Sequence, residues 1–191
     1  MGANDNTPLL SRHRLSVADY YRMGEAGIFA PNARVELIDG EIIDMAPIGA
    51  RHAAAVSRLN RAVTAAVNTR AIVSVQNPLR LSDLSEPEPD LMLLQPRADF
   101  YADAHPGAAD VLLLIEVADA SARYDREIEL PLYARHGVPE VWIVDLEARL
   151  VRFYRQPAGD AYVQATTTAT PGRTPIAALP GTEIDLAQLL G

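Results

Sequence analysis

The sequence contains no cysteine and no lysine. Without cysteine the chain can form neither disulfide bonds nor thiolate metal sites, a composition that fits a reducing compartment. Without lysine, all 17 basic side chains are arginines. Because arginine stays protonated at any working pH, it can bind a phosphate but cannot exchange a proton with water as lysine can.

Long apolar runs are also absent. No stretch approaches the ~20 residues that a helix needs to span a bilayer, and no basic segment followed by an apolar one opens the chain. We therefore expect a cytoplasmic protein without a membrane partner. The sequence shows no internal repeat, no phosphate-binding glycine loop and no serine or cysteine nucleophile motif, which argues against the protein classes that depend on them.

Positive charge is scarce: 17 basic residues against 25 acidic ones leave a net charge of −8. Non-specific DNA affinity comes mainly from basic side chains that neutralise phosphates, so this balance does not favour DNA binding. Two groups of arginines, one on a predicted helix and one on a predicted strand, could still form local positive surfaces: Arg51, Arg58, Arg61, Arg149, Arg152 and Arg155. Alternatively, these arginines balance nearby acidic residues on solvated faces.

The length and composition predict one globular domain. The chain has 191 residues, of which 49% are hydrophobic, enough for one well-buried core. Residues 1–14 show no periodicity and are predicted to be a mobile arm, which leaves residues 15–191 for the domain. Between apolar runs, Asp39-Gly40 indicates a β-hairpin, because glycine tolerates a positive φ.

The periodicity of the remaining sequence predicts an α+β fold. The predicted elements are a helix over 16–25, a hairpin over 34–45, a helix over 51–68, strands over 71–81, 90–94 and 111–118, a helix over 125–135 that begins at a capping Asp125 and is kinked by Pro131, a strand over 140–145 and a hairpin over 149–168. This order describes a mixed sheet flanked by helices, with an N-terminal and a C-terminal β-hairpin.

Two carboxylates stand at the ends of predicted buried strands. Asp90 precedes the apolar run Leu91–Leu94, and Glu116 interrupts the apolar run over 111–118. A carboxylate inside a core strand is costly unless it is paired, protonated or bound to a metal ion. Asp90 is the expected neighbour of Glu116, and two converging carboxylates repel each other unless a divalent cation neutralises both.

Oxygen ligands of this kind suit a hard ion, Mg²⁺ or Mn²⁺. The alternative is structural: Asp90 caps the start of its strand, and Glu116 pairs with an arginine. His52, in the first turn of a predicted helix, has no second histidine at metal-binding spacing, so we interpret it as a structural residue and do not expect zinc.

Several short motifs carry a family resemblance. They are Arg34-Val-Glu-Leu-Ile-Asp-Gly-Glu-Ile42, His52, Val75-Gln-Asn-Pro-Leu-Arg80, Pro89-Asp90, Ile115-Glu-Val-Ala118, Tyr124-Asp-Arg126 and Tyr133-Ala-Arg-His-Gly-Val-Pro-Glu-Val-Trp-Ile-Val-Asp145. In this order they resemble the Uma2 (DUF820) family of putative restriction endonucleases, within the PD-(D/E)XK nuclease superfamily. The resemblance covers about residues 15–190 and implies a restriction-endonuclease-like fold.

The resemblance implies a metal-dependent endonuclease that hydrolyses DNA phosphodiester bonds with Mg²⁺ or Mn²⁺. Asp90 and Glu116 would bind the metal ion, and Gln76, in the middle of its predicted strand, and Glu36 would complete the catalytic site. A homodimer is expected, since cutting both strands of DNA usually takes two sites. Whether DNA or RNA is cut is left open by the sequence.

Two further expectations concern charge at the site. Arg126 and Arg80 are the candidate phosphate contacts. The superfamily lysine would fall at Ala118, and relatives more often carry a lysine where this chain has Glu129. These departures support a second hypothesis, a catalytically inactive nuclease-like module that binds nucleic acid or a protein partner.

Overall fold

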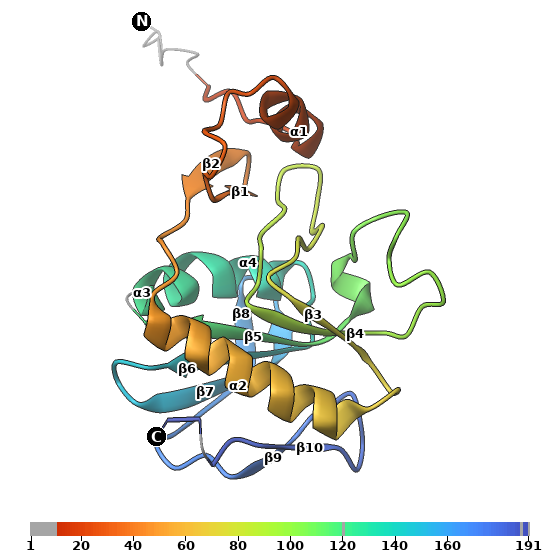
Figure 1. Cartoon of the computed structure of the whole chain (residues 1–191), viewed down its shortest axis with the longest axis vertical. Helices are drawn as coiled ribbons and strands as arrows, with labels where there is room; N and C mark the ends of the chain where they lie inside the picture. Colours follow the sequence, from red (N-terminus) through yellow and green to blue (C-terminus); the bar gives the residue numbers. More distant parts are fainter. Residues whose placement is uncertain (1–10, 120, 188, 191) are drawn as a thin grey trace, which may run out of the picture.

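A six-stranded mixed sheet forms the body of the protein in the computed structural model (Figure 1), which describes residues 11–119, 121–187 and 189–190. In spatial order the strands are β3 (Ile72–Val75), β4 (Leu91–Leu94), β5 (Val111–Ala118), β6 (Glu140–Asp145), β7 (Leu150–Ala158) and β8 (Ala161–Thr168). Strands β5 and β6 are parallel, and every other neighbouring pair is antiparallel. The predicted α+β fold is confirmed, and the C-terminal hairpin extends the sheet as β7 and β8.

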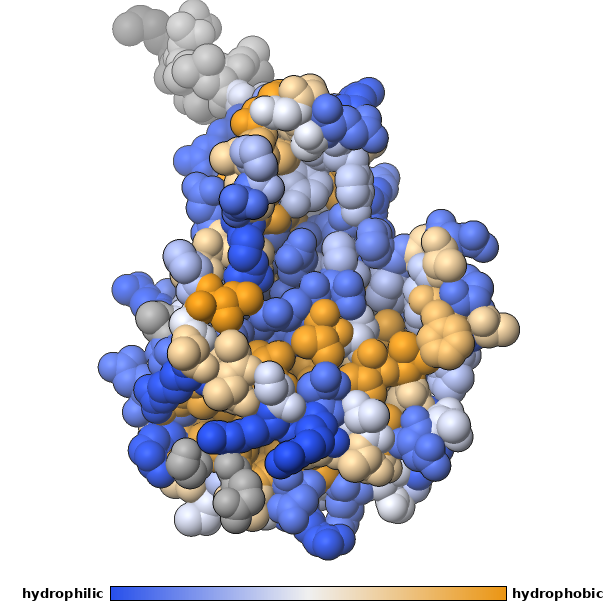
Figure 2. All heavy atoms as spheres, viewed as in Figure 1, coloured by the Kyte–Doolittle hydropathy of each residue, from blue (hydrophilic) through white to orange (hydrophobic). Residues whose placement is uncertain are grey.

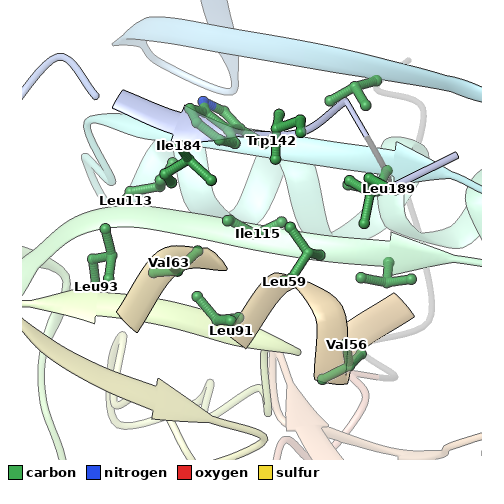
Figure 3. Close-up of a cluster of buried hydrophobic side chains, with 14 of the residues drawn as sticks. Val56, Leu59, Val63, Leu91, Leu93, Leu113, Ile115, Trp142, Ile184 and Leu189 are labelled. Atoms are coloured by element: carbon green, nitrogen blue, oxygen red, sulfur yellow. The ribbon is translucent and has the colours of Figure 1, made fainter. Parts of the chain in front are cut away.

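The central strands are mainly apolar because helices cover both faces of the sheet. Alternate side chains such as Leu93 and Ile115 pack against α2 (Ala50–Val67), which lies across one face (Figure 3). The intervening side chains, such as Leu114, pack on the opposite face around Tyr133. No helix in the described ranges is both long and apolar enough to cross a membrane.

An N-terminal lobe stands beside the sheet. It consists of α1 (Val17–Glu25), β1 (Val35–Ile38) and β2 (Glu41–Asp44). The loop over residues 77–90, between β3 and β4, reaches up to this lobe (Figure 1). There the Glu86 N–H donates to the Leu37 carbonyl, and the Gly40 N–H donates to the Leu84 carbonyl, each over 2.7 Å. The loop thus ties the lobe to the sheet.

Local sequence signals account for the lobe. Ser16 and Asp19 form a capping box at the start of α1, with the Asp19 N–H donating to Ser16 Oγ over 3.1 Å. Asp39 and Gly40 connect β1 to β2 with φ values of 49° and 79°. A Cβ on Gly40 would lie 2.5 Å from the Cβ of Arg14, so this position requires glycine.

The helical segment after β5 differs from the prediction. It consists of α3 (Ala122–Tyr124), a π-helical turn η2 (Asp125–Glu129) and α4 (Leu130–Arg135). Asp125 does not cap the helix: it lies inside the segment and is buried. The Leu130 N–H donates to the Asp125 carbonyl, and the neighbouring Pro131 has no N–H to continue the α-helical pattern.

Three shorter elements complete the fold. They are the 3₁₀ turn η1 (Ala108–Asp110) and the strands β9 (Arg173–Pro175) and β10 (Glu183–Asp185), which pair antiparallel with each other. Ile184 of β10 packs into the core beside α2 (Figure 3). Of the arm predicted over residues 1–14, residues 1–10 lie outside the described part of the chain, and Arg12 forms an ion pair of 3.1 Å with Glu41.

Candidate active site

A cavity of about 450 Å³ lies where the N-terminal lobe meets the sheet. Its walls come from the lobe, the segment joining β2 to α2, the first turn of α2, the start of β4, the end of β5 and the segment over 121–129. The acidic residues that line it are Glu36, Asp44, Glu88, Asp90, Glu116, Asp119, Asp125 and Glu129. Acidic side chains from elements far apart in the sequence therefore converge on this cavity.

Three separate segments hold the Asp90 carboxylate. Its Oδ1 accepts a hydrogen bond from Gln76 Nε2 (3.1 Å) and lies 2.9 Å from His52 Nε2. Its Oδ2 accepts from the Val117 N–H over 2.9 Å. Because each bond comes from a different element, the position of this carboxylate depends on the assembled tertiary structure.

Gln76 reaches Asp90 through a local backbone bend. We predicted Gln76 in the middle of a strand, but β3 ends at Val75, and Gln76 has a φ of 49°. A positive φ is uncommon for a residue other than glycine. Its N–H donates to the Asp90 carbonyl over 3.2 Å, so both its backbone and its side chain bind the same aspartate.

Glu116 lies directly against Asp90. Its Oε2 accepts from the Asp90 N–H (3.1 Å), and its Oε1 accepts from the Tyr133 hydroxyl (2.7 Å). Within the described residues, no arginine nitrogen lies within 4.0 Å of either carboxylate. The alternative that Glu116 pairs with an arginine is therefore wrong, and the two acids converge as predicted.

Three more carboxylates surround this pair. Glu36 of β1 accepts from the Tyr124 hydroxyl (3.1 Å) and from the Glu88 N–H (3.3 Å), while Asp125 accepts from the Ser121 hydroxyl (3.2 Å). Glu129 also lines the cavity and is buried. Asp125 and Glu129 are the first and last residues of the π-helical turn η2, and both line the cavity.

Burial governs the protonation of this cluster. It raises the pKa of Glu36, Glu116 and Glu129, and the neighbouring carboxylates raise the last two further. Burial also raises the pKa of Asp125 to about 7, with a further contribution from Asp90. Among the described residues no arginine pairs with Asp90 or Glu116, so a cation would stabilise the charged forms of these two carboxylates.

The donors fit Mg²⁺ or Mn²⁺ in chemistry and in charge. They are oxygen ligands, which these hard ions prefer. In the described ranges no group of three or more histidine, aspartate or glutamate side chains is placed to hold a metal ion together. The protein would therefore supply a carboxylate pair, Asp90 and Glu116, and leave the other positions to water and substrate, as is common for Mg²⁺.

The structure separates the predicted phosphate contacts from the cavity. Neither Arg126 nor Arg80 is among the residues that line it. Arg126 lies 3.5 Å from an Asp145 oxygen, and Arg80 lies 3.1 Å from Asp83 and 3.4 Å from Glu86. These arginines neutralise acids elsewhere, and the direction of their side chains could not be predicted from local patterns.

Other site residues were missed at the sequence level. His52, which we interpreted as structural, contacts Asp90, and this hydrogen bond raises the pKa of His52. Arg34 is the one arginine among the described residues that line the cavity. Tyr133 reaches Glu116 from α4. The motifs around these residues suggested a family but not a contact, because the contacts join distant segments.

We expect the metal-free protein to become less stable as the pH rises from about 5 to 8. Asp125 has a pKa of about 7 in the folded chain and an ordinary value of 3.8 when unfolded, so the stability that its proton contributes is lost as the pH rises between these two values. His52 acts in the same direction, because its raised pKa adds stability that is lost as the pH increases. Thermal unfolding in EDTA should show a decrease in Tm on the order of 5 °C.

The Asp125→Asn variant provides the control for this pH profile. It removes the titrating carboxyl but keeps its size, and its Tm should depend less on pH than that of the wild type. A wild-type Tm that stays constant or rises between pH 5 and 8 would contradict the expected cost of burying these carboxylates.

If Glu116 binds the metal ion as predicted, we expect Tyr133→Phe to weaken Mn²⁺ binding about 10- to 100-fold, because the Tyr133 hydroxyl donates to the Glu116 carboxylate. Isothermal titration calorimetry measures this change directly. Tyr162→Phe is a matched control, since the Tyr162 hydroxyl donates to the Val138 carbonyl and does not line the cavity. Equal Mn²⁺ affinities in the two variants would show that Tyr133 does not support a metal ligand.

The comparisons with known proteins concern the family and the fold. The Uma2 family model, described as "Putative restriction endonuclease", matches residues 17–187. Among solved structures, the chain is similar to a putative nuclease of DUF820 from Anabaena variabilis ATCC 29413, with a TM-score of 0.68 and 14% identity. That likeness covers 92% of this chain and 97% of the other, and it concerns the fold. No curated protein matches the chain.

Proposed function

The chain belongs to the Uma2 family, and from this premise we propose that it is a metal-dependent endonuclease that hydrolyses DNA phosphodiester bonds. One observation carries the proposal. Asp90 and Glu116 converge at one cavity, joined by a backbone hydrogen bond of 3.1 Å, among carboxylates with raised pKa values. Clusters of perturbed carboxylates in a cavity favour a functional site.

Asp90 and Glu116 would hold the metal ion. When bound, Mg²⁺ or Mn²⁺ supplies positive charge that stabilises the negative charge developing on the phosphate and lowers the pKa of water. Gln76 and His52 fix the orientation of the Asp90 carboxylate, and Tyr133 fixes that of Glu116. These bonds hold the ligand oxygens before substrate arrives, as efficient catalysis requires.

Because the chain contains no lysine, other residues must exchange protons with water and with the leaving group. Hydrolysis adds water across the phosphorus–oxygen bond, so one proton must leave the attacking water and one must reach the leaving oxygen. Glu36 and His52 line the cavity. Burial raises the pKa of Glu36, and the hydrogen bond with Asp90 raises that of His52. Side chains of these two types can accept and donate protons, which supports a role for Glu36 or His52.

The second candidate function is a nuclease-like module that binds nucleic acid or a protein partner without cleavage. Glu129 favours it, because its carboxylate adds negative charge at the cavity where the family resemblance places a lysine. Repulsion between Glu129 and a substrate phosphate would slow catalysis.

Incubation with supercoiled plasmid tests the proposal. We expect nicking with Mn²⁺ or Mg²⁺ and none in EDTA or in the Asp90→Ala variant. Retention of DNA in EDTA without cleavage under any metal condition would support the binding module. Failure to retain DNA even at low salt would leave only a role with a protein partner.

A further inference from the structure

The carboxylates of the cavity are recessed from the surface. Glu36, Glu116, Asp125 and Glu129 are 3%, 5%, 5% and 7% exposed, and the Asp90 side chain is 13% exposed. In duplex DNA, base pairing and stacking restrict how far a nucleotide can extend into a protein. Enzymes whose pockets enclose a base therefore use single strands or take one nucleotide out of the stack.

Arg34 can provide a phosphate contact inside the cavity. It is half-buried, its Nη1 donates to the Ala46 carbonyl over 3.4 Å, and no carboxylate of the described residues lies within 4.0 Å of its guanidinium. Burial raises the pKa of Glu88, and the positive charge of Arg34 acts in the opposite direction. By contrast, Arg51 does not line the cavity and is paired with Asp119 over 3.3 Å. Guanidinium groups bind phosphate oxygens through paired hydrogen bonds.

An apolar wall lies on the same cavity. It is formed by the segment that joins β2 to α2, where Met45, Ala46, Pro47 and Ile48 line the cavity. Ile48 is 41% exposed, and Figure 2 shows hydrophobic side chains exposed at the junction between the lobe and the body. A nucleic-acid base offers a flat apolar face that can cover such a wall.

The size and charge of the site limit the occupant. The volume of about 450 Å³ falls in the range of pockets that enclose one small molecule, roughly 300–1,000 Å³. Duplex binding draws its affinity from many basic contacts to phosphates. With a net charge of −8 and one arginine lining the cavity in the described part of the chain, the site is better matched to one phosphate than to a duplex.

We propose that the cavity binds one unpaired nucleotide, with its phosphate on Arg34 and its base against the wall of Met45–Ile48, so that single-stranded DNA is the substrate class of this site. This inference rests on the proposed nuclease function and specifies its substrate. It also explains why apolar side chains and recessed carboxylates share one cavity.

Cleavage of a labelled oligonucleotide, alone or annealed to its complement, tests the inference. With Mn²⁺ we expect the single strand to be cut at least about 10-fold faster than the duplex, because the duplex must first release a nucleotide. Equal or faster cleavage of the duplex would overturn this inference and leave the proposed function intact. Failure to bind or cleave either form would overturn both.

Binding measurements with matched variants test the two contacts separately, using fluorescence anisotropy in Ca²⁺ with gel analysis to verify that the strand stays intact. Arg34→Ala should weaken single-strand binding about 10-fold and lower the salt slope by about 0.7, and Arg34→Lys should restore the slope but only part of the affinity. Arg123→Ala is the control, since Arg123 is exposed and pairs with Glu127. An unchanged slope in Arg34→Ala would overturn the phosphate contact.

Ile48→Ala should weaken single-strand binding about 5-fold through lost apolar contact. Ile28→Ala is the matched control, because Ile28 is 62% exposed and does not line the cavity. Mn²⁺ affinity should remain unchanged in Ile48→Ala and should not fall in Arg34→Ala, which removes a positive charge beside the cavity carboxylates. This measurement separates substrate binding from damage to the metal ligands. Equal DNA affinities for Ile48→Ala and Ile28→Ala would overturn the base contact.

Discussion

Replacing Asp90 with asparagine is expected to lower the rate of Mn²⁺-dependent plasmid nicking about 10³-fold. A bound divalent ion stabilises transition-state charge by several kcal/mol, and a loss of about 4 kcal/mol corresponds to this factor. Asparagine keeps the size of the side chain but removes the negative charge that would hold the ion. The initial rate of nicking at equal enzyme concentrations measures the effect, and calorimetry should show weaker Mn²⁺ binding.

The controls for Asp90→Asn separate chemistry from folding. Asp160→Asn changes an exposed aspartate between β7 and β8 and should leave nicking unchanged. In EDTA, Asp90→Asn should unfold at the same or a higher temperature than the wild type, since it removes one of two adjacent carboxylates. Nicking by Asp90→Asn at the wild-type rate would contradict the assignment of this cavity as the active site.

Replacing Glu129 with lysine is expected to increase the nicking rate about 10²–10⁴-fold, the usual contribution of a positioned group that activates water. Glu129 lines the cavity, and its neighbours include the carboxylates of Glu116 and Asp125, which would keep the new ammonium group charged. The substitution also removes a buried negative charge that repels the substrate phosphate. The plasmid assay used for Asp90 measures the gain.

Two further variants of the same helical segment serve as controls for the expected increase in nicking rate. Glu127→Lys places the same charge on the exposed side of the segment, where Glu127 pairs with Arg123. It should not accelerate nicking. Glu129→Gln removes the carboxylate charge without adding an amine, so its rate measures the part due to repulsion alone. If Glu129→Lys is no faster than Glu127→Lys, the missing lysine does not limit catalysis in this protein.

Much of the fold could be predicted because its signals are local. The Asp39-Gly40 turn, the capping box at Ser16 and the apolar runs of β4 and β5 each depend on neighbouring residues. The segment over 122–135 was less predictable. Its π-helical turn moves Asp125 from the predicted helix cap into the cavity wall, and such a turn has no simple sequence period.

The site was predictable only in part. Glu116 could be identified because a carboxylate within an apolar strand requires a special partner, and Asp90 because it precedes the next apolar run. His52, Arg34 and Tyr133 could not be assigned to the site, since each reaches it from a different element. Arg80 and Arg126, the predicted phosphate contacts, pair with acids away from this cavity, and an arginine in sequence does not reveal which acid it pairs with.

The sequence by itself determined the order of helices and strands, the burial of the sheet on both faces and the kind of chemistry available. Without cysteine or lysine, and with acids at the ends of buried strands, only oxygen and imidazole donors can hold a cation here. The tertiary structure alone decided that the Asp90 and Glu116 carboxylates meet without an arginine while Arg34 faces the same cavity. The physical reason is that electrostatic interactions act across space, between segments whose closeness no local pattern encodes.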